Sequence, residues 1–331
     1  MASLKDVAKL ASVSLMTVSR AINNPEQLRP ETYQRVMQAI DALNYVPDFS
    51  ARKMRGNTTK TSTLGVLAFD TATTPFSVEM LLSIELTARE CGWNSFLVNQ
   101  TSAEDSERAV NQLLSQRPDG IIFTTMGLRS IQIPARLMDK KLVLANCVSD
   151  NSDVASYIPD DFLGQYQAIK RLIECGYRRP LCFYLPENTL AAQARRAGAE
   201  KAWQDAGLPL SDLRQEHMIW GDEHYPDVVT LLNAHCPNDK LDFDILVCGN
   251  DRIAFLAYQV LLAKGIKIPQ QVGVLGYDNM VGIGGLFLPP LTTVQLPHDE
   301  IGRAAALHLI QGRTDSEIHK IPCPLLERSS L

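Results

Sequence analysis

The chain opens with LKDVAKLASVSLMTVSRAINN (residues 4–24), in which two short helical patterns lie on either side of a polar break at residues 12–14. The first pattern begins near Leu4, and the apolar residues that fall on one side of such a helix are Val7, Ala8, Leu10 and Ala11. In the second, Ser14 is suited to cap a helix over residues 15–22, with Val18 and Ile22 pointing inward. Two short helices joined by three residues predict a helix-turn-helix unit.

A third helix is expected to complete this small core. Pro30 suits a first helical position because its missing N–H is not needed there, and the face that follows carries Tyr33, Val36, Met37, Ile40 and Leu43.

The outward side of the second helix has the layout of a recognition helix, whose first turn meets base edges in a major groove. Its residues are Leu15, Met16, Thr17, Arg20 and Asn23. Arg20 can make a bidentate contact to guanine, and Leu15 and Met16 can touch apolar features such as thymine methyl groups. Thr17 and Asn23 suit phosphates. The spacing of these residues alone leaves an alternative to DNA binding open, namely an ordinary solvent-exposed surface on a small helical bundle.

The residues after the third helix are interpreted as a hinge followed by a linker. Asp48 can cap a two-turn helix over residues 49–55, which stops at Gly56. Isolated helices shorter than about 12 residues are marginal in water, so we expect this one to be ordered only when something packs against it. The polar residues 57–63, NTTKTST, form the linker.

From residue 64 onward, short apolar strands alternate with amphipathic helices. We expect strands over residues 64–69, 95–99, 120–124, 142–147, 181–185, 245–248, 272–277 and 291–296, and a further strand-like stretch over 318–326. The intervening helices end at glycines suited to a left-handed cap, namely Gly92, Gly176, Gly207 and Gly265. This alternation predicts parallel sheets covered by helices on both faces, two of them in a body of this length, with ligands at the carboxyl ends of the strands.

Charge is divided unevenly along the 331 residues. Residues 1–60 carry nine Lys or Arg against five Asp or Glu, whereas the whole chain carries 32 against 37. This imbalance favours a small anion-binding head on an acidic body. No apolar run reaches membrane-spanning length and the first residues lack a secretory signal, so a cytoplasmic protein is expected. The seven scattered cysteines are typical of reduced, mostly buried side chains.

The motifs of common enzyme classes are missing from the sequence. No G-x-G-x-x-G follows the first predicted strand, and Gly282, Gly284 and Gly285 come late with the wrong spacing for a dinucleotide. There is no G-x-S-x-G elbow, no Walker loop and no H-E-x-x-H helix. The six histidines are dispersed, and His235 beside Cys236 cannot form a metal site alone. We therefore expect no enzyme, no cofactor and no metal site.

The opening stretch, followed by YVPDFSARKMR (45–55), resembles the head and hinge of the LacI/GalR transcriptional regulators. The body is similar to this family as well, in TPFS (74–77), PDGIIF (118–123), GNDRIAF (249–255), VGVLGYDN (272–279) and LPPLTTV (288–294). The resemblance implies an α/β fold with an N-terminal helix-turn-helix DNA-binding head, joined by a hinge helix to a two-subdomain, periplasmic-binding-protein-like body of parallel sheets. The implied boundaries are 1–46 for the head, 47–61 for hinge and linker, 62–158 with 293–321 for the N-terminal subdomain, and 159–292 with 322–331 for the C-terminal subdomain.

The resemblance also implies a homodimer whose paired heads bind a pseudo-palindromic operator, with paired hinges in the central minor groove. The family wedges an apolar hinge side chain, usually Leu, between central base pairs; here that position is Met54, which keeps the apolar wedge but is more flexible. Arg52, Lys53 and Arg55 are expected to add phosphate or groove contacts. The sequence ends without a leucine heptad of the kind that makes some relatives tetrameric, so a dimer is expected.

For an effector pocket between the subdomains, the family's positions fall on Asp70, Phe76, Asn146, Arg195, Asn250 and Asp278. Arg195 would grip hydroxyls or carboxylates, Asp278 would accept two adjacent hydroxyls, and Asp70 and Phe76 would offer an acceptor and an apolar face to a sugar ring. Asn146 and Asn250 would add amide donors and acceptors. Asn250 is equally suited to cap the following helix, and Asp251 is interpreted as structural. His298 stands where some relatives have an aromatic residue.

Carboxylate, guanidinium and amide groups around an aromatic face suit a neutral polyol better than a purine or a phosphorylated ligand. The stretches DTATTPFS (70–77), SYIPDD (156–161) and FLPPLTTVQLPHD (287–299) are similar to members of the family that control sucrose operons in enteric bacteria. Sucrose or a component sugar is therefore the predicted effector. The alternatives are a sugar-binding transport receptor without a DNA function and a regulator with a different effector. Whether the effector weakens or strengthens DNA binding is left open.

Overall fold

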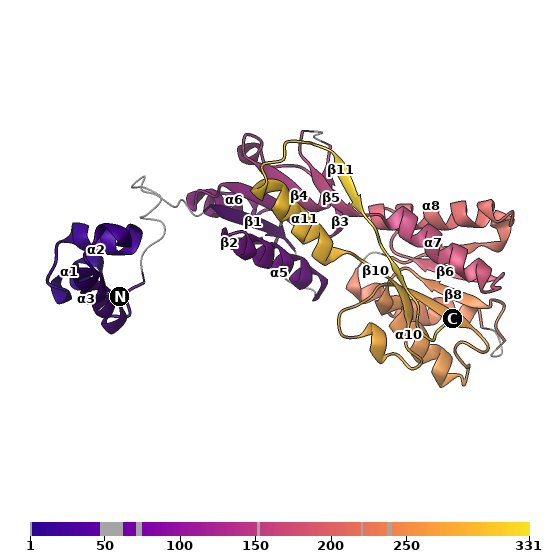
Figure 1. Cartoon of the computed structure of the whole chain (residues 1–331). Coiled ribbons are helices and arrows are strands. Elements are labelled where there is room, and N and C mark those ends of the chain that lie inside the picture. The colour runs from indigo at the N-terminus through magenta and orange to yellow at the C-terminus, as the bar shows by residue number, and fades with distance from the viewer. Residues whose placement is uncertain (1, 47–61, 71–74, 151–152, 220, 237–239) are drawn as a thin grey trace. The chain divides into compact units, whose positions relative to one another are not determined.

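Three helices build the N-terminal part of the computed structural model, which describes residues 2–46, 62–70, 75–150, 153–219, 221–236 and 240–331 (Figure 1). They are α1 (Leu4–Leu10), α2 (Leu15–Asn23) and α3 (Pro30–Ala42), with a short 3₁₀ turn, η1 (Pro25–Gln27), before the third. Ser3 and Asp6 form a capping box at the start of α1, and the Ser14 hydroxyl accepts a hydrogen bond from the Thr17 N–H at the start of α2. The expected helix-turn-helix unit is confirmed.

The core of this unit consists of small and β-branched side chains from all three helices: Val7, Ala8, Ala11, Val18, Ala21, Val36 and Ala39. Leu10 was expected in this core, but that prediction is wrong because its side chain is 54% exposed. With Val7, Ala8 and Ala11 facing inward, Leu10 lies about 100° around the helix from the centre of the buried face. The expected hinge helix, including Arg52, Met54 and Arg55, and the linker up to residue 61 fall outside the described residues, and Thr63, the last residue of the expected linker, is the first residue of β1.

Residues 62–331 form a second compact unit, which contains two six-stranded sheets. The first sheet has the order β11-β5-β4-β3-β1-β2, and every neighbouring pair in it is parallel. Its strands are β1 (Thr63–Phe69), β2 (Asn94–Gln100), β3 (Gly120–Ile131), β4 (Leu142–Ser149), β5 (Ser156–Pro159) and β11 (Ile318–Ile321). Apolar side chains fill both faces, which is why its central strands are continuous apolar runs in the sequence.

The second sheet has the order β12-β10-β9-β8-β6-β7 and is parallel except for the β10/β12 pair. Its strands are β6 (Pro180–Tyr184), β7 (Arg214–His217), β8 (Ile245–Cys248), β9 (Gly273–Asp278), β10 (Thr292–Gln295) and β12 (Leu325–Leu326). Two clusters of buried apolar side chains pack on its opposite faces. The expectation of two parallel-type sheets, each covered on both faces, is therefore confirmed.

Helices from the connections cover the sheets, as Figure 1 shows for α5 and α11 beside the first sheet and for α7 and α8 beside the second. The first sheet has α5 (Pro75–Glu90), α6 (Ser106–Ser115), α11 (His298–Ile310) and the turn η2 (Ala135–Leu137). The second has α7 (Asp161–Glu174), α8 (Leu190–Asp205), α9 (Asp227–Ala234), α10 (Asp251–Ala263) and the turns η3 (Leu210–Asp212), η4 (Asp222–His224) and η6 (Gly284–Leu286). Among the described helices, none has the length and apolarity to cross a bilayer.

The chain passes between the two sheets after β5, after β10 and after β11. The expected boundary at residue 293 is wrong, because β10 pairs with β9 and β12 in the second sheet and the chain leaves that sheet only after Gln295. The expected strand over 318–326 is also two strands in different sheets. They are separated by residues 322–324, where Pro322 and Pro324 cannot donate ladder hydrogen bonds.

One close helix contact yields a stability prediction. A side chain on Gly198 of α8 would collide with the backbone carbonyl of Phe162 in α7, so these helices approach at a distance that only glycine permits. We expect Gly198→Ala to lower the free energy of unfolding by about 1–3 kcal/mol, as overpacking does. Chemical denaturation followed by circular dichroism measures this loss. Gly285→Ala is the matched control, because nothing lies within 4 Å of the added methyl group; equal losses in the two variants would contradict the close approach.

Candidate functional site

The outer face of α2 presents the residues expected to contact DNA. Met16 is 65% and Leu15 42% exposed, although both are apolar. The exposed Arg20 lies one turn after Met16, and its Nη2 is 3.7 Å from the Met16 sulfur. The Thr17 hydroxyl lies 2.9 Å from the Ser14 hydroxyl, so it also takes part in the helix cap. An exposed apolar pair on the first turn of α2, with a guanidinium one turn later on the same side, is an arrangement suited to reading base edges in a groove.

The four remaining DNA-binding predictions are limited by what the structure describes. Asn23 is the last residue of α2, but its side chain lies outside the described part of the chain. The same holds for all of Arg52, Met54 and Arg55. Their roles therefore stay predictions.

In the body, three predicted site residues have a positive φ angle, and two of them lie where a strand ends. The φ angles are 53° at Asp70 directly after β1 and 106° at Asp278, the last residue of β9. Asn146 has a φ angle of 58° inside β4, three residues before that strand ends at Ser149. Asp and Asn tolerate this region better than other residues with a side chain, and such conformations gather at binding sites. These three positions therefore hold short polar side chains on a backbone conformation that strands do not normally adopt.

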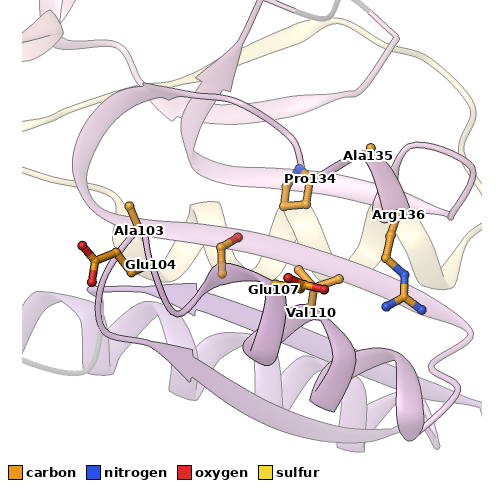
Figure 2. A pocket seen from close by; sticks show the side chains of 8 residues that line it. Ala103, Glu104, Glu107, Val110, Pro134, Ala135 and Arg136 are labelled. Carbon is orange, nitrogen blue, oxygen red and sulfur yellow. The ribbon is translucent and has the colours of Figure 1, made fainter.

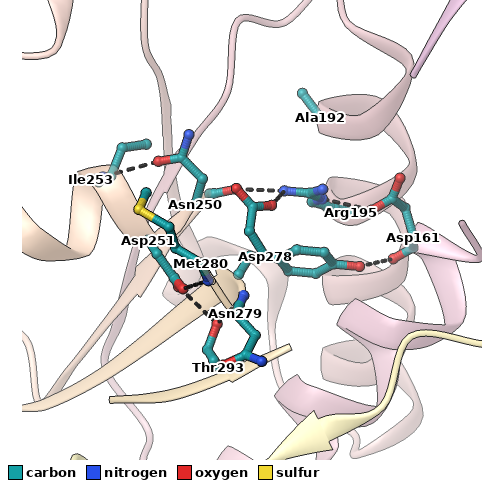
Figure 3. Close-up of polar contacts among 12 residues, drawn as sticks. Asp161, Ala192, Arg195, Asn250, Asp251, Ile253, Asp278, Asn279, Met280 and Thr293 are labelled. Carbon is teal, nitrogen blue, oxygen red and sulfur yellow. Dashed lines mark hydrogen bonds and ion pairs between the residues drawn. The ribbon is translucent and has the colours of Figure 1, made fainter. Parts of the chain in front are cut away.

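Arg195 is the centre of the most tightly connected polar group in the body (Figure 3). Its side chain is 3% exposed, and its Nε donates a hydrogen bond of 2.8 Å to Oδ1 of Asp161, the first residue of α7. Its Nη1 donates to the carbonyl of Gly249 at 2.6 Å and lies 3.7 Å from Oδ1 of Asp278. The guanidinium carbon stands 3.5 Å from the centre of the Tyr277 ring. Arg195 thus connects two helices to the ends of β8 and β9.

Burial and charge act against each other in this group. Burial disfavours the charged guanidinium, but Asp161 together with Tyr277 and Asp278 raises the pKa of Arg195 above its ordinary value. Burial raises the pKa of the Asp278 carboxyl well above its ordinary value, and the attraction of Arg195 offsets only part of this. One arginine therefore faces two carboxylates, one of which holds a proton more readily than an exposed aspartate.

His298 approaches this group from α11, which packs on the first sheet. It is the first residue of α11 and is 6% exposed. Burial, helped by the positive charge of Arg195, lowers the pKa of His298 to about 4. The imidazole is therefore neutral near pH 7, and the effect of Arg195 on its pKa links this polar, uncharged ring of α11 to the Arg195 group.

Asn250 uses its side chain in two contacts within the second sheet. Its Oδ1 accepts a hydrogen bond of 2.9 Å from the Ile253 N–H and so caps α10, and its Nδ2 donates to the Tyr225 hydroxyl at 2.7 Å. The capping interpretation is confirmed, and a ligand contact by Asn250 stays a prediction. The amide is held in a fixed orientation beside Gly249, whose carbonyl accepts from Arg195.

Asp251 is structural, as expected. It is 1% exposed, and its Oδ2 accepts a hydrogen bond of 2.7 Å from the Met280 N–H. Its Oδ1 accepts one of 2.8 Å from the Thr293 hydroxyl. Asp251 thereby fastens the start of α10 to β10 and to the segment that follows Asp278.

The predicted residues of the first sheet are not in contact with the Arg195 group in the described part of the chain. Asn146 donates from Nδ2 to the Thr125 carbonyl at 3.1 Å. Asp70 lies 3.9 Å from Nη2 of Arg129. Phe76 belongs to the first turn of α5, but its side chain lies outside the described residues. The structure therefore brings Arg195, Asp278 and the Asn250 backbone region together, and it holds Asp70 and Asn146 on the other sheet.

Asp161 is the member of the Arg195 group that sequence reasoning missed. It is 2% exposed, and its Oδ2 accepts no hydrogen bond from any described residue. The signal was the pair Asp160-Asp161. Asp160 accepts a hydrogen bond of 3.1 Å from the Leu163 N–H and caps α7, which leaves the second aspartate to face inward.

A separate hollow of about 390 Å³ lies on the first sheet's side, between the start of α6 and the segment before β4 (Figure 2). It is lined by Ala103, Glu104, Ser106, Glu107, Val110, Pro134, Ala135 and Arg136. None of the predicted ligand residues lines it. Its two glutamates and single arginine make no connected group comparable to that around Arg195, so we place the candidate ligand site at the strand ends instead.

Comparisons with known proteins cover both units of the chain. The family model for bacterial regulatory proteins of the lacI family matches residues 3–48. The model for periplasmic binding proteins and the sugar binding domain of the LacI family matches residues 61–329.

Individual relatives match over the full length. The sucrose operon repressors of Escherichia coli and Shigella flexneri are each 62% identical over 330 residues, covering 100% of both chains. The HTH-type transcriptional repressor PurR of Histophilus somni is 32% identical over 91% of this chain and 89% of its own. Among solved structures, the lac repressor dimer bound to operator and the anti-inducer ONPF has a TM-score of 0.81 at 23% identity, covering 99% and 98%.

The charge balance around Arg195 yields a prediction for Asp278→Asn. The raised pKa of Asp278 in the folded state means that the folded chain keeps a proton that the unfolded chain releases above pH 3.8. The free energy of unfolding therefore falls as the pH rises above 3.8. The amide keeps the shape and removes that cost, and Arg195 retains Asp161. We expect the variant to be more stable than the wild type by about 1 kcal/mol or more at neutral pH, with the difference vanishing in acid. Thermal unfolding at a series of pH values measures it.

The control for this prediction is Asp205→Asn, which removes an exposed carboxylate paired with Lys201 on α8. Its pKa is lowered by the hydrogen bond from Lys201, so its removal should leave stability at neutral pH equal or slightly lower. If Asp278→Asn is clearly less stable than the wild type at neutral pH, the assigned charge balance is wrong.

Proposed function

The chain belongs to the LacI family of bacterial regulatory proteins, which are DNA-binding transcriptional repressors, and we propose that its operator affinity is controlled by sucrose or one of its component sugars. The observation that carries this proposal is the 62% identity over the whole chain to sucrose operon repressors, in a body whose buried arginine and aspartates suit a hydroxyl-rich ligand.

The N-terminal unit supports sequence-specific DNA binding. Arg20 offers two parallel donors to guanine, and Met16 and Leu15, one turn earlier in α2, offer exposed apolar contacts. We propose that two copies of the chain bind a pseudo-palindromic operator as a homodimer, just as the structurally similar lac repressor binds its operator as a dimer. The protein would then act in the cytoplasm, where the operator is.

The ligand site that we propose lies between the two sheets, around Arg195. A sugar hydroxyl can donate to a carboxylate oxygen of Asp278 or to Oδ2 of Asp161, while the guanidinium donates to other oxygens of the same ring. His298 would reach the sugar from the first sheet as a neutral donor or acceptor. We propose that Asp70, Phe76 and Asn146 close the site from the first sheet and that Asn250 lines it beside Gly249.

Coupling to DNA follows from the two-sheet construction. A sugar that contacts both sheets favours the arrangement in which they are closest, and the three chain crossings transmit any rotation of one sheet relative to the other. We propose that this rotation alters the hinge segment of residues 49–55. Because a two-turn helix has little stability of its own, a coupling free energy of about 1–3 kcal/mol is enough to change operator affinity by five- to about 150-fold.

Two other functions are less well supported. A sugar-binding transport receptor has no use for residues 3–48, which match a regulatory-protein model. A regulator with a different effector is the other alternative, but the HTH-type transcriptional repressors PurR are 28–33% identical to this chain, whereas the sucrose operon repressors reach 62%. The aspartates around Arg195 also suit hydroxyl donors more than a purine ring.

The sugar specificity predicts the outcome of calorimetric titration. We expect the full chain to bind sucrose, fructose or glucose, and we expect Arg195→Lys to lose at least tenfold in affinity because an ammonium cannot donate in two fixed directions. Arg196→Lys is the matched control: Arg196 pairs with Glu200 away from this group, so its affinity should stay within twofold of the wild type. Absence of heat with all three sugars, together with clear binding of a purine such as hypoxanthine, would overturn the sugar assignment.

The DNA half of the function predicts a change in sequence selectivity. On an operator selected from random duplexes, Arg20→Lys should lose about 1–3 kcal/mol of binding free energy and its preference for guanine at one position, with little change on unrelated DNA. Gel-shift titrations at fixed salt measure both affinities. Arg35→Lys on the exposed surface of α3 serves as the control. Equal losses on operator and unrelated DNA would mean that Arg20 contacts phosphate only.

A further inference from the structure

Two histidines and one aspartate meet at the edge of the first sheet, far along the chain from the Arg195 group. His308 lies in the last turn of α11, His319 lies in β11, and Asp315 lies in the segment between them. One ligand atom from each residue lies within 4.8 Å of the other two. The His319 Nε2 is already 2.5 Å from Oδ1 of Asp315. Two imidazoles and a carboxylate are a ligand set that zinc and similar divalent transition metals prefer.

Each of these three side chains is held by a partner outside the cluster. The Tyr157 hydroxyl lies 3.1 Å from Nδ1 of His308, which fixes that ring. The Tyr157 ring stacks on His319, with centroids 4.5 Å apart and planes 14° from parallel. Arg313 Nη2 lies 3.1 Å from Oδ2 of Asp315, the oxygen that does not face His319. Outer partners that orient the ligands in this way are a regular feature of metal sites.

One charge next to the cluster acts against metal binding. The positive charge of Arg313 beside Asp315 repels a metal cation. It therefore lowers the affinity of the cluster for the metal ion without changing the arrangement of the three ligands.

We propose that His308, Asp315 and His319 bind a divalent transition metal ion of the zinc class, with water completing the coordination. The bound ion joins the end of α11 to β11 at the edge of the first sheet. Because the chain crosses to the second sheet at residues 322–324, directly after β11, the ion stiffens the start of one of the three crossings. The sequence pattern does not predict this site, since the spacing His-x₆-Asp-x₃-His matches no metal motif and the fold alone brings the residues together.

Metal titration of the full chain tests the proposal. The protein is first treated with a chelator and carries Cys91→Ser and Cys175→Ser, because these two cysteines are exposed and a thiolate is itself a zinc ligand. Cobalt(II) is added while the visible absorption is followed, and zinc is then used to displace it. We expect one equivalent per chain with the intense absorption of four-coordinate cobalt, and a rise in the melting temperature on zinc binding.

Variants assign the site. His319→Gln and Asp315→Asn change partly exposed residues and should each weaken zinc binding at least tenfold, while circular dichroism verifies that they stay folded. His235→Gln is the matched control: His235 lies 2.6 Å from Glu216 but has no second imidazole beside it, so the affinity should not change. Arg313→Gln removes the opposing charge and should tighten binding severalfold.

Two results would overturn the proposal. One is the lack of stoichiometric binding at micromolar metal, and the other is binding whose affinity is the same in His319→Gln and Asp315→Asn as in the parent. Neither result bears on the sugar or DNA function, because none of the three residues takes part in those sites.

Discussion

The buried ion pair between Arg195 and Asp161 is the constraint on which the proposed ligand site of the body depends. A guanidinium that is 3% exposed can stay charged only if nearby groups replace its water, and here Asp161, the Gly249 carbonyl and the Tyr277 ring do so. These groups belong to the start of α7 and to the ends of β8 and β9, while Arg195 itself comes from α8. Satisfying a single charge therefore fixes the relative positions of two helices and two strand ends.

The packing around this pair follows from the same requirement. For Arg195 to reach Asp161, α8 must lie close to α7, and Gly198 provides the room one turn further along α8. On its other side, α7 carries Gly164, where a side chain would meet the Cβ of Cys323 and the Tyr277 hydroxyl. Cys323 lies in the last crossing between the sheets. The helix that supplies Asp161 is thus packed against both the arginine's helix and a connection to the other sheet.

Much of the fold can be predicted from the sequence because buried parallel strands are continuous apolar runs, and all the interior strands except β5 were found in this way. The two strands that were missed, β5 and β7, are four residues long, and β7 (RQEH) is a polar edge strand without an apolar pattern. The boundary error at residue 293 has a different cause. A strand's own residues do not reveal which of two sheets it joins, since that depends on its partners β9 and β12.

The candidate site was predictable only in part. Arg195 and Asp278 were found from family motifs, but their partner Asp161 is 34 residues from Arg195 in the chain, and no local pattern reports such a contact. For Asn250, the difficulty was a choice between two roles rather than a missed partner. Its sequence context fitted both a helix cap and a ligand contact, and the structure displays the cap, which leaves Nδ2 directed at Tyr225. Local rules identify which groups are polar and buried, whereas their partners come from the fold.

The charges around Arg195 also favour one class of ligand. One guanidinium faces Asp161 and Asp278, so the site has no excess positive charge with which to hold a phosphate or carboxylate. A proton on Asp278, whose pKa burial raises, would neutralise the group and still leave it without a net attraction for anions. A neutral ligand avoids this repulsion, and its hydroxyls can both donate to the aspartates and accept from the arginine. The balance of one base against two acids therefore supports the proposal of a neutral, hydroxyl-rich sugar over its phosphorylated form.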